Sequence, residues 1–69
     1  MSDNVYSVSE IVGTSPDGVE AAVKNALARA RKTLRNLDWF ETTEIRGHLG
    51  EDGEIEHWQV TLKLGFRME

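Results

Sequence analysis

One helical stripe constrains the fold of this chain more than any other feature of its sequence. Between residues 19 and 37, apolar side chains recur at the three- and four-residue spacing of an amphipathic α-helix: Val19, Val23, Ala26, Leu27, Ala30, Leu34 and Leu37. Ser15-Pro16-Asp17 predicts the start of this helix, because serine caps free amides, proline suits the first helical position and aspartate complements the helix dipole. We expect the helix to run to about Arg35, over about 20 residues or roughly 30 Å.

Segments with the patterns of β-strands lie on both sides of this helix. Residues 5–12 are rich in valine and isoleucine and predict a first strand that ends at Gly13 and Thr14. Residues 38–49 and 54–67 predict two more strands, joined by a polar hairpin loop at residues 50–53. The order β-α-β-β predicts a single α+β domain, residues 1–69, in which a three-stranded antiparallel sheet wraps along one long amphipathic helix.

The last strand alternates cleanly between apolar and other residues. The apolar face is expected to enter the core and comprises Trp58, Val60, Leu62, Leu64 and Phe66. The opposite face of the same strand carries His57, Gln59, Thr61, Lys63 and Gly65. A single helix covers one side of such a sheet, so this second face is either wet or covered by another subunit.

The preceding strand breaks the alternation at Trp39 and Phe40. Adjacent strand residues point to opposite faces, so both rings cannot enter one core without a backbone irregularity. We predict a β-bulge between Phe40 and Ile45, which lets both of these residues face the helix and turns Trp39 outward. Spacing alone favours ordinary packing or a subunit contact for Trp39 over ligand stacking, but an outward ring is also where a planar ligand can dock.

A hairpin centred near Asp52 and Gly53 brings polar residues together on the second face. Arg46 is then expected opposite Gln59, and His48 opposite His57, within one residue of register. These side chains form a polar wall: the Gln59 amide donates and accepts, Arg46 is always a cation, and the two histidines add imidazoles. Such a wall can hydrogen-bond the polar edge of a heterocycle. Each of these residues is also consistent with an ordinary solvated or cross-strand polar side chain without a role in binding.

Size and composition indicate self-association. A core in a chain of 69 residues rarely supplies more than about 3–5 kcal/mol without a disulfide, a metal or a partner subunit. The chain has no cysteine and only two histidines, which excludes disulfides and thiolate sites and argues against a structural zinc site, so no metal is expected. A homo-oligomer is therefore the expected source of the missing stability.

Charge and hydropathy exclude several other classes. The net charge of −4 argues against a nucleic-acid binder. No apolar run approaches the roughly 18 residues of a membrane span, and the start lacks the features of a signal peptide, so we expect a cytoplasmic protein without membrane contact. The sequence contains no cysteine nucleophile, GxSxG or HExxH motif, and we expect no enzymatic activity.

Four fragments in order and spacing resemble the dodecin family across essentially the whole chain. They are residues 10–15 (EIVGTS), 37–41 (LDWFE), 45–48 (IRGH) and 58–67 (WQVTLKLGFR). The resemblance implies a hollow homododecamer of cubic 23 symmetry that binds flavins and stores them without turnover. It further implies that Trp39 stacks on the isoalloxazine ring, with two flavins between symmetry-related tryptophans, and that Gln59 hydrogen-bonds the polar edge of the ring.

The residues leave some choices open. Arg46 is a candidate for a second wall contact or for a flavin phosphate, and riboflavin, FMN and FAD share the ring that Trp39 and Gln59 are expected to hold. Thr42 and Trp58 depart mildly from the family pattern, which usually has an aliphatic residue and tyrosine or phenylalanine there. The alternatives to flavin storage are an oligomer in which Trp39 is only a subunit anchor and, with less support, a flavin-using enzyme.

Overall fold

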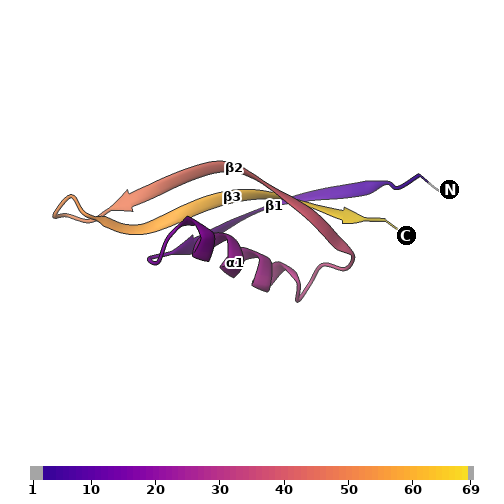
Figure 1. The fold of residues 1–69 in the computed structure, drawn as a ribbon, viewed down its shortest axis with the longest axis horizontal. Coiled ribbons are helices and arrows are strands. Elements are labelled where there is room, and N and C mark those ends of the chain that lie inside the picture. Colours follow the sequence, from indigo (N-terminus) through magenta and orange to yellow (C-terminus); the bar gives the residue numbers. More distant parts are fainter. Residues whose placement is uncertain (1–2, 69) are drawn as a thin grey trace.

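The computed structural model describes residues 3–68 and has the predicted β-α-β-β order. Its elements are β1 (Tyr6–Ser15), α1 (Val19–Ala30), β2 (Leu37–Leu49) and β3 (Ile55–Arg67). The strands form one antiparallel sheet in the order β1-β3-β2, with α1 along one side (Figure 1). The molecule is elongated, 56 × 20 × 14 Å, because the β2-β3 hairpin extends past the end of the helix.

The core lies between α1 and the central strand. Val60, Leu62 and Leu64 of β3 are fully buried, as the alternation predicts, and they pack with buried alanines of the helix: Ala22, Ala26 and Ala30. The prediction that Trp58 belongs to this buried set was wrong, since its side chain is only half-buried. Trp58 pairs with Ser15, the last residue of β1, and beyond that point the central strand loses one neighbour.

A very close approach joins the helix to β1. A Cβ atom at Gly13 would lie 2.7 Å from the Cβ of Ala26 and would also collide with the carbonyl oxygen of Ala22. Alanines on the helix and glycine on the strand therefore let the two backbones approach closely. Small residues also contribute little apolar area, which keeps this core small.

The helix is shorter than predicted at its C-terminal end. It ends at Ala30, and the following residues form turns in which Thr33 N–H donates to the carbonyl of Ala30 at 3.1 Å. Leu34 and Leu37 still pack on the core, but from the loop and from the start of β2. Asn36, with φ of 61°, reverses the chain so that Leu37 pairs with Phe66. A turn that returns apolar residues to the same core repeats the spacing of a helix. Periodicity alone therefore predicted a helix longer than α1.

The predicted helix start and the end of the first strand were also wrong. The strand β1 continues through Gly13 and Thr14 to Ser15, and α1 begins at Val19 behind Gly18, without a side-chain cap. The hydroxyl oxygen of Ser15 instead accepts a hydrogen bond from the backbone N–H of Asp17 at 3.0 Å. The serine therefore stabilises the turn between strand and helix and not the helix itself.

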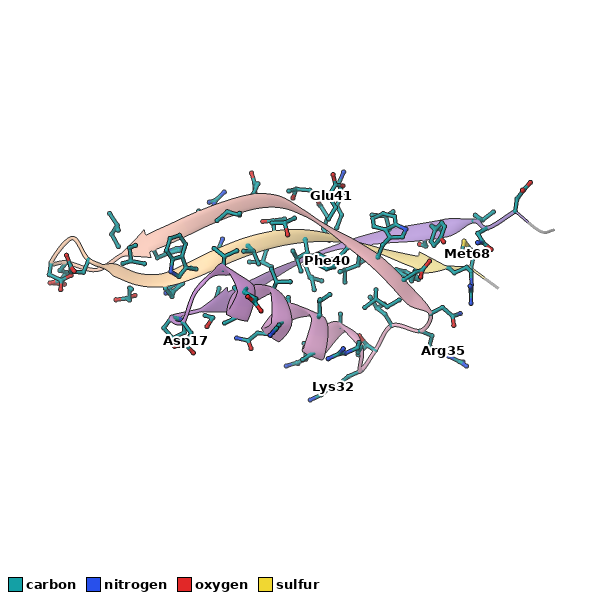
Figure 2. All side chains as sticks on the ribbon, in the orientation of Figure 1. Asp17, Lys32, Arg35, Phe40, Glu41 and Met68 are labelled. Carbon is teal, nitrogen blue, oxygen red and sulfur yellow. The ribbon has the colours of Figure 1, made fainter. Side chains whose placement is uncertain are left out.

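The predicted β-bulge is confirmed. The register of β2 against β3 shifts between Thr42 and Glu44, which places Phe40 opposite Leu64 and Ile45 opposite Val60, on the helix side. Figure 2 shows Phe40 on this side of the sheet and Glu41 on the other. The helix packs on β1 and β3 and does not cover β2, so Phe40 and Ile45 remain 46% and 57% exposed.

We expect Gly13→Ala to destabilise the fold by about 1–3 kcal/mol, because the added methyl group overpacks the contact between β1 and α1. Thermal unfolding at fixed protein concentration measures the loss. Glu10→Ala, an exposed position on the opposite face of β1, is the matched control and should change stability by less than about 0.5 kcal/mol. Equal melting temperatures of Gly13→Ala and the native chain would contradict the close approach of β1 and α1.

Candidate functional site

The sheet face opposite α1, here called the open face, carries the candidate site residues. Register places its side chains in rows that cross the sheet from β1 through β3 to β2. One end has the row Val8, Gly65 and Trp39, and the other end has the row Thr14, Gln59 and Arg46. Two rows separate them: the charged row Glu10-Lys63-Glu41 and the mixed row Val12-Thr61-Glu44.

Trp39 forms a plate at the first end of the open face. Its indole ring lies directly over Gly65, where any Cβ atom would collide with the ring carbons. One ring face is thus covered by backbone while the side chain as a whole is 40% exposed. An aromatic ring held flat on a glycine offers its free face to another planar group.

Tyr6 supports this plate and was not recognised from the sequence. Its ring centroid lies 6.0 Å from that of Trp39 at a tilt of 57°, and its hydroxyl donates to Oδ2 of Asp38 at 2.7 Å. The hydrogen bond to the Asp38 carboxylate is the main cause that raises the pKa of Tyr6 above its ordinary value. Finding it from sequence requires the register across three strands, which the first strand's pattern does not supply.

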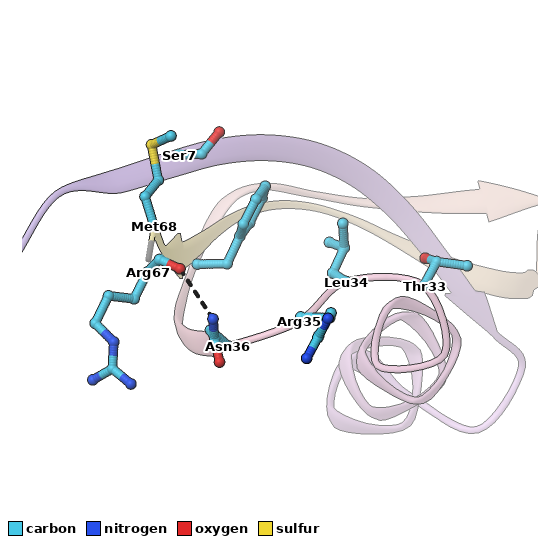
Figure 3. Close-up of a pocket in the computed structure, with 8 residues that line it drawn as sticks. Ser7, Thr33, Leu34, Arg35, Asn36, Arg67 and Met68 are labelled. Atoms are coloured by element: carbon cyan, nitrogen blue, oxygen red, sulfur yellow. Dashed lines mark hydrogen bonds between the residues drawn. The ribbon is translucent and has the colours of Figure 1, made fainter.

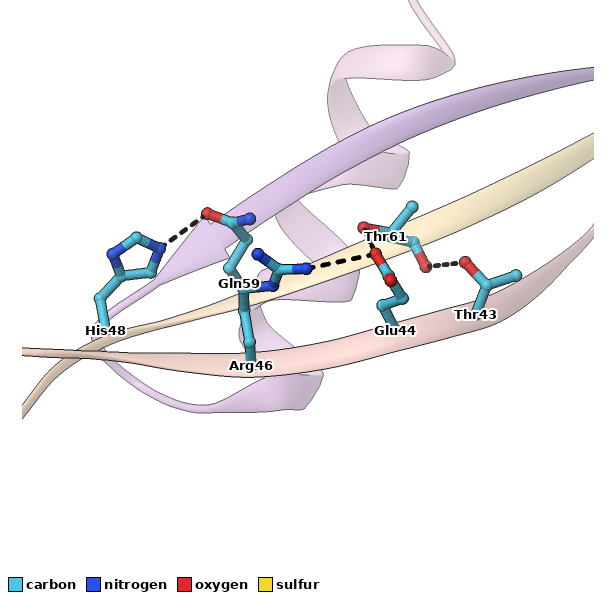
Figure 4. Close-up of polar contacts among 6 residues, drawn as sticks. All are labelled: Thr43, Glu44, Arg46, His48, Gln59 and Thr61. Atoms are coloured by element: carbon cyan, nitrogen blue, oxygen red, sulfur yellow. Dashed lines mark hydrogen bonds and ion pairs between the residues drawn. The ribbon is translucent and has the colours of Figure 1, made fainter.

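Gln59 lies in a polar wall at the other end of the open face, as predicted. Arg46 is directly opposite Gln59, and His48 is directly opposite His57. His48 also reaches diagonally to Gln59, with 3.1 Å between its Nε2 and the amide Oε1 (Figure 4). The two imidazole rings stack with centroids 4.4 Å apart and an angle of 18° between their planes.

Arg46 has an exposed acidic neighbour on the same strand. Its guanidinium lies 3.5 Å from Oε1 of Glu44, which also accepts a hydrogen bond from the hydroxyl of Thr61 at 3.3 Å (Figure 4). Both charged side chains are more than half exposed, so this pair contributes little stability in water. The guanidinium therefore keeps N–H donors free for an incoming group.

The structure brings Gln59 and Arg46 together but leaves Trp39 apart from them. Trp39 pairs with Gly65, six residues along β3 from Gln59, which corresponds to about 20 Å of strand. One ring system cannot touch both residues of the same chain across this span.

A separate recess lies on the helix side, near the C-terminal end of β3. Its volume is about 410 Å³, and it is lined by Ser7, Thr33, Leu34, Arg35, Asn36, Phe66, Arg67 and Met68 (Figure 3). The side-chain amide of Asn36 donates to the carbonyl of Arg67 at its edge, at 3.4 Å. Neither Trp39 nor Gln59 borders this recess, so cavity size does not locate the predicted site.

Within residues 3–68, no three histidine, aspartate or glutamate side chains gather closely enough to hold a metal ion. In the same range, no helix is long and apolar enough to cross a membrane.

Comparisons with known proteins assign the chain to a family. The family model for dodecins matches residues 5–69. The chain belongs to the dodecin family. The dodecin of Thermus thermophilus is 62% identical over 65 residues, which cover 94% of this chain and 93% of that protein.

Solved dodecin structures share the fold along the whole chain. The dodecin of Streptomyces coelicolor is 64% identical with a TM-score of 0.91, covering 100% of this chain and 97% of the other. A calcium dodecin of Mycobacterium tuberculosis is 31% identical, with a TM-score of 0.82 over 94% and 91% of the two chains. The predicted fold and family are therefore confirmed, and membership of the dodecins supports a small flavin-binding protein that assembles into an oligomer.

We expect Gly65→Ala to displace the Trp39 ring, because the new methyl group occupies the space of the indole. In a Trp58→Phe background, Trp39 is the remaining tryptophan, and its emission maximum and its quenching by acrylamide report the displacement. Gly47→Ala is the matched control, since a Cβ atom there has its nearest neighbour at 3.9 Å, an ordinary contact. Unchanged emission in Gly65→Ala would contradict the position of the plate.

Proposed function

We propose that this dodecin is a non-enzymatic protein that binds flavins, stores them and limits their photochemistry. The observation that carries the proposal is the Trp39 ring, held flat on Gly65 with its other face open. An isoalloxazine ring is flat and apolar on its faces and polar along one edge, so it needs an aromatic plate and a hydrogen-bonding wall. Trp39 supplies the plate, and Gln59 supplies the wall.

The separation of Trp39 and Gln59 implies a site shared between copies. Stacking contributes about 0.5–1.5 kcal/mol beyond buried area, and a net hydrogen bond about 0.5–1.5 kcal/mol, so one plate and one amide bind weakly. Useful affinity requires that most of the ring surface is enclosed, which a pocket between subunits provides. In this proposal Trp39 of one subunit and Gln59 of another contact the same flavin.

Exposed apolar side chains support the assembly on which this site depends. Residues that are more than half exposed include Val5, Val8, Val12, Ile45, Leu49, Ile55 and Met68. Such a density of exposed apolar groups in 69 residues marks surfaces that contact other molecules. We propose that copies of this chain cover them in a homododecamer of 23 symmetry, the assembly implied by the family.

The first test is a titration of riboflavin and of FMN with the protein, read by flavin fluorescence. We expect saturable quenching, because an indole in contact with the ring quenches its emission. Trp39→Ala should weaken binding by about tenfold or more, and Gln59→Ala by about two- to tenfold, through the lost stacking area and the lost hydrogen bond. Trp39→Phe keeps an aromatic plate and should fall between the native chain and Trp39→Ala.

Size-exclusion chromatography on the same samples separates the proposal from its alternative. Retained assembly in Trp39→Ala, together with weakened binding, supports a ligand plate. Loss of assembly in Trp39→Ala indicates that Trp39 is only a subunit anchor. A native assembly that leaves flavin emission unchanged would refute flavin storage, and steady turnover with a reduced nicotinamide would refute the non-enzymatic role.

Arg46 is proposed to contact a flavin phosphate, because its exposed guanidinium lies directly opposite Gln59. We expect Arg46→Ala to weaken the binding of FMN more than that of riboflavin. FMN loses the cation that pairs with its phosphate, whereas riboflavin has no anionic group. Glu41→Ala, on the same face of the same strand, is a control for general surface changes. Equal weakening of FMN and riboflavin would place the guanidinium at the ring edge instead.

A further inference from the structure

The amide of Gln59 has two different ends, and His48 occupies one of them. The Nε2 atom of His48 lies 3.1 Å from Oε1, the carbonyl oxygen of the amide. A carbonyl oxygen accepts and has no proton to give, so a hydrogen bond at this contact requires the tautomer of His48 with its proton on Nε2. In that tautomer the histidine donates to Gln59.

His48 is itself held in place by its cross-strand partner. Its ring stacks on His57, with centroids 4.4 Å apart and planes 18° from parallel. The side chain of His57 is 30% exposed, and its Nδ1 lies 3.8 Å from a carboxylate oxygen of Glu56. The stack covers one face of the His48 ring, and Nε2 at the ring edge lies beside Gln59.

The other end of the amide is directed away from His48. Figure 4 shows the nitrogen of the Gln59 amide on the side opposite the imidazole, toward the part of the wall that contains Arg46. Arg46 lies directly opposite Gln59 and carries only donors. With its carbonyl engaged by His48, Gln59 adds further N–H donors to this wall.

We propose that His48 is a positioning residue that orients the Gln59 amide so that its NH₂ group faces the ligand. The inference rests on the proposed flavin-binding function. The wall then presents donors, and it selects the acceptor atoms along the edge of the flavin, its carbonyl oxygens, over its imide N–H. This differs from the expectation drawn from the sequence, where the amide was free to donate and to accept.

A double-mutant cycle tests whether His48 acts through Gln59. Riboflavin affinity is measured by fluorescence quenching for the native chain, His48→Ala, Gln59→Ala and the double variant. We expect His48→Ala to weaken binding about two- to tenfold in the native background and to have no effect in the Gln59→Ala background, because the residue that it orients is gone. Equal weakening in both backgrounds, or none in either, would overturn the proposal.

Two substitutions at His48 separate orientation from simple packing. His48→Gln restores an N–H donor to the carbonyl of Gln59 and should recover most of the affinity. His48→Glu offers only acceptors, turns the Gln59 amide around and should bind more weakly than His48→Ala. Glu20→Ala, an exposed position on α1 away from the open face, is the control, with affinity expected within twofold of the native chain. Equal affinities in His48→Gln and His48→Glu would refute the orienting role.

A measurement without flavin keeps this inference separate from the proposed function. Long-range proton–nitrogen NMR of the ligand-free protein, at a pH where imidazoles are neutral, identifies the protonated ring nitrogen of His48. A proton on Nε2 supports the hydrogen bond to Oε1, and a proton on Nδ1 overturns it. If native protein fails to bind riboflavin while Nε2 is protonated, the flavin proposal fails and the orientation of Gln59 stands.

Discussion

Alternation along the central strand β3 is the constraint on which both the core and the site depend. Val60, Leu62 and Leu64 face α1 and are fully buried, while the residues between and beside them face away from it. Successive strand residues point to opposite sides, so a core on one face commits Gln59 and Thr61 to the other. A register slip of one residue would move the apolar residues of β3 to the open face and the polar residues into the core. It would therefore destroy both the core and the candidate site.

The bulge in β2 has a comparable effect on the edge of the sheet. The extra residue between Thr42 and Glu44 leaves Phe40 and Ile45 on the helix side and Trp39 on the open face. The hydroxyl of Thr43 donates to the carbonyl of Thr61 at 3.3 Å, which ties the bulged residue to its neighbour. A 12-residue helix then covers only β1 and β3, and the uncovered apolar groups are available for contacts between copies.

These two features explain why the candidate site is divided. The Trp39 plate lies near the start of β2, and the Gln59 wall lies toward its other end, near the β2-β3 hairpin. Local support differs at the two ends: Gly65 and Tyr6 contact the indole, whereas His48, stacked on His57, contacts the amide. A rigid sheet keeps the two halves about 20 Å apart within one chain, so binding and assembly are physically coupled in this proposal.

The sequence by itself determined the element order, the buried face of β3, the bulge in β2 and the pairing of Arg46 with Gln59. All of these follow from local periodicity and from a short hairpin, which the chain specifies without distant contacts. It did not determine where α1 ends, because Leu34 and Leu37 pack on the core from a turn with helix-like spacing. The partial burial of Trp58, the support of Trp39 by Tyr6 and the bond from His48 to Gln59 were decided by the tertiary structure alone. Each depends on which strands are neighbours and where each strand ends, and such long-range pairing leaves no periodic signal in the sequence.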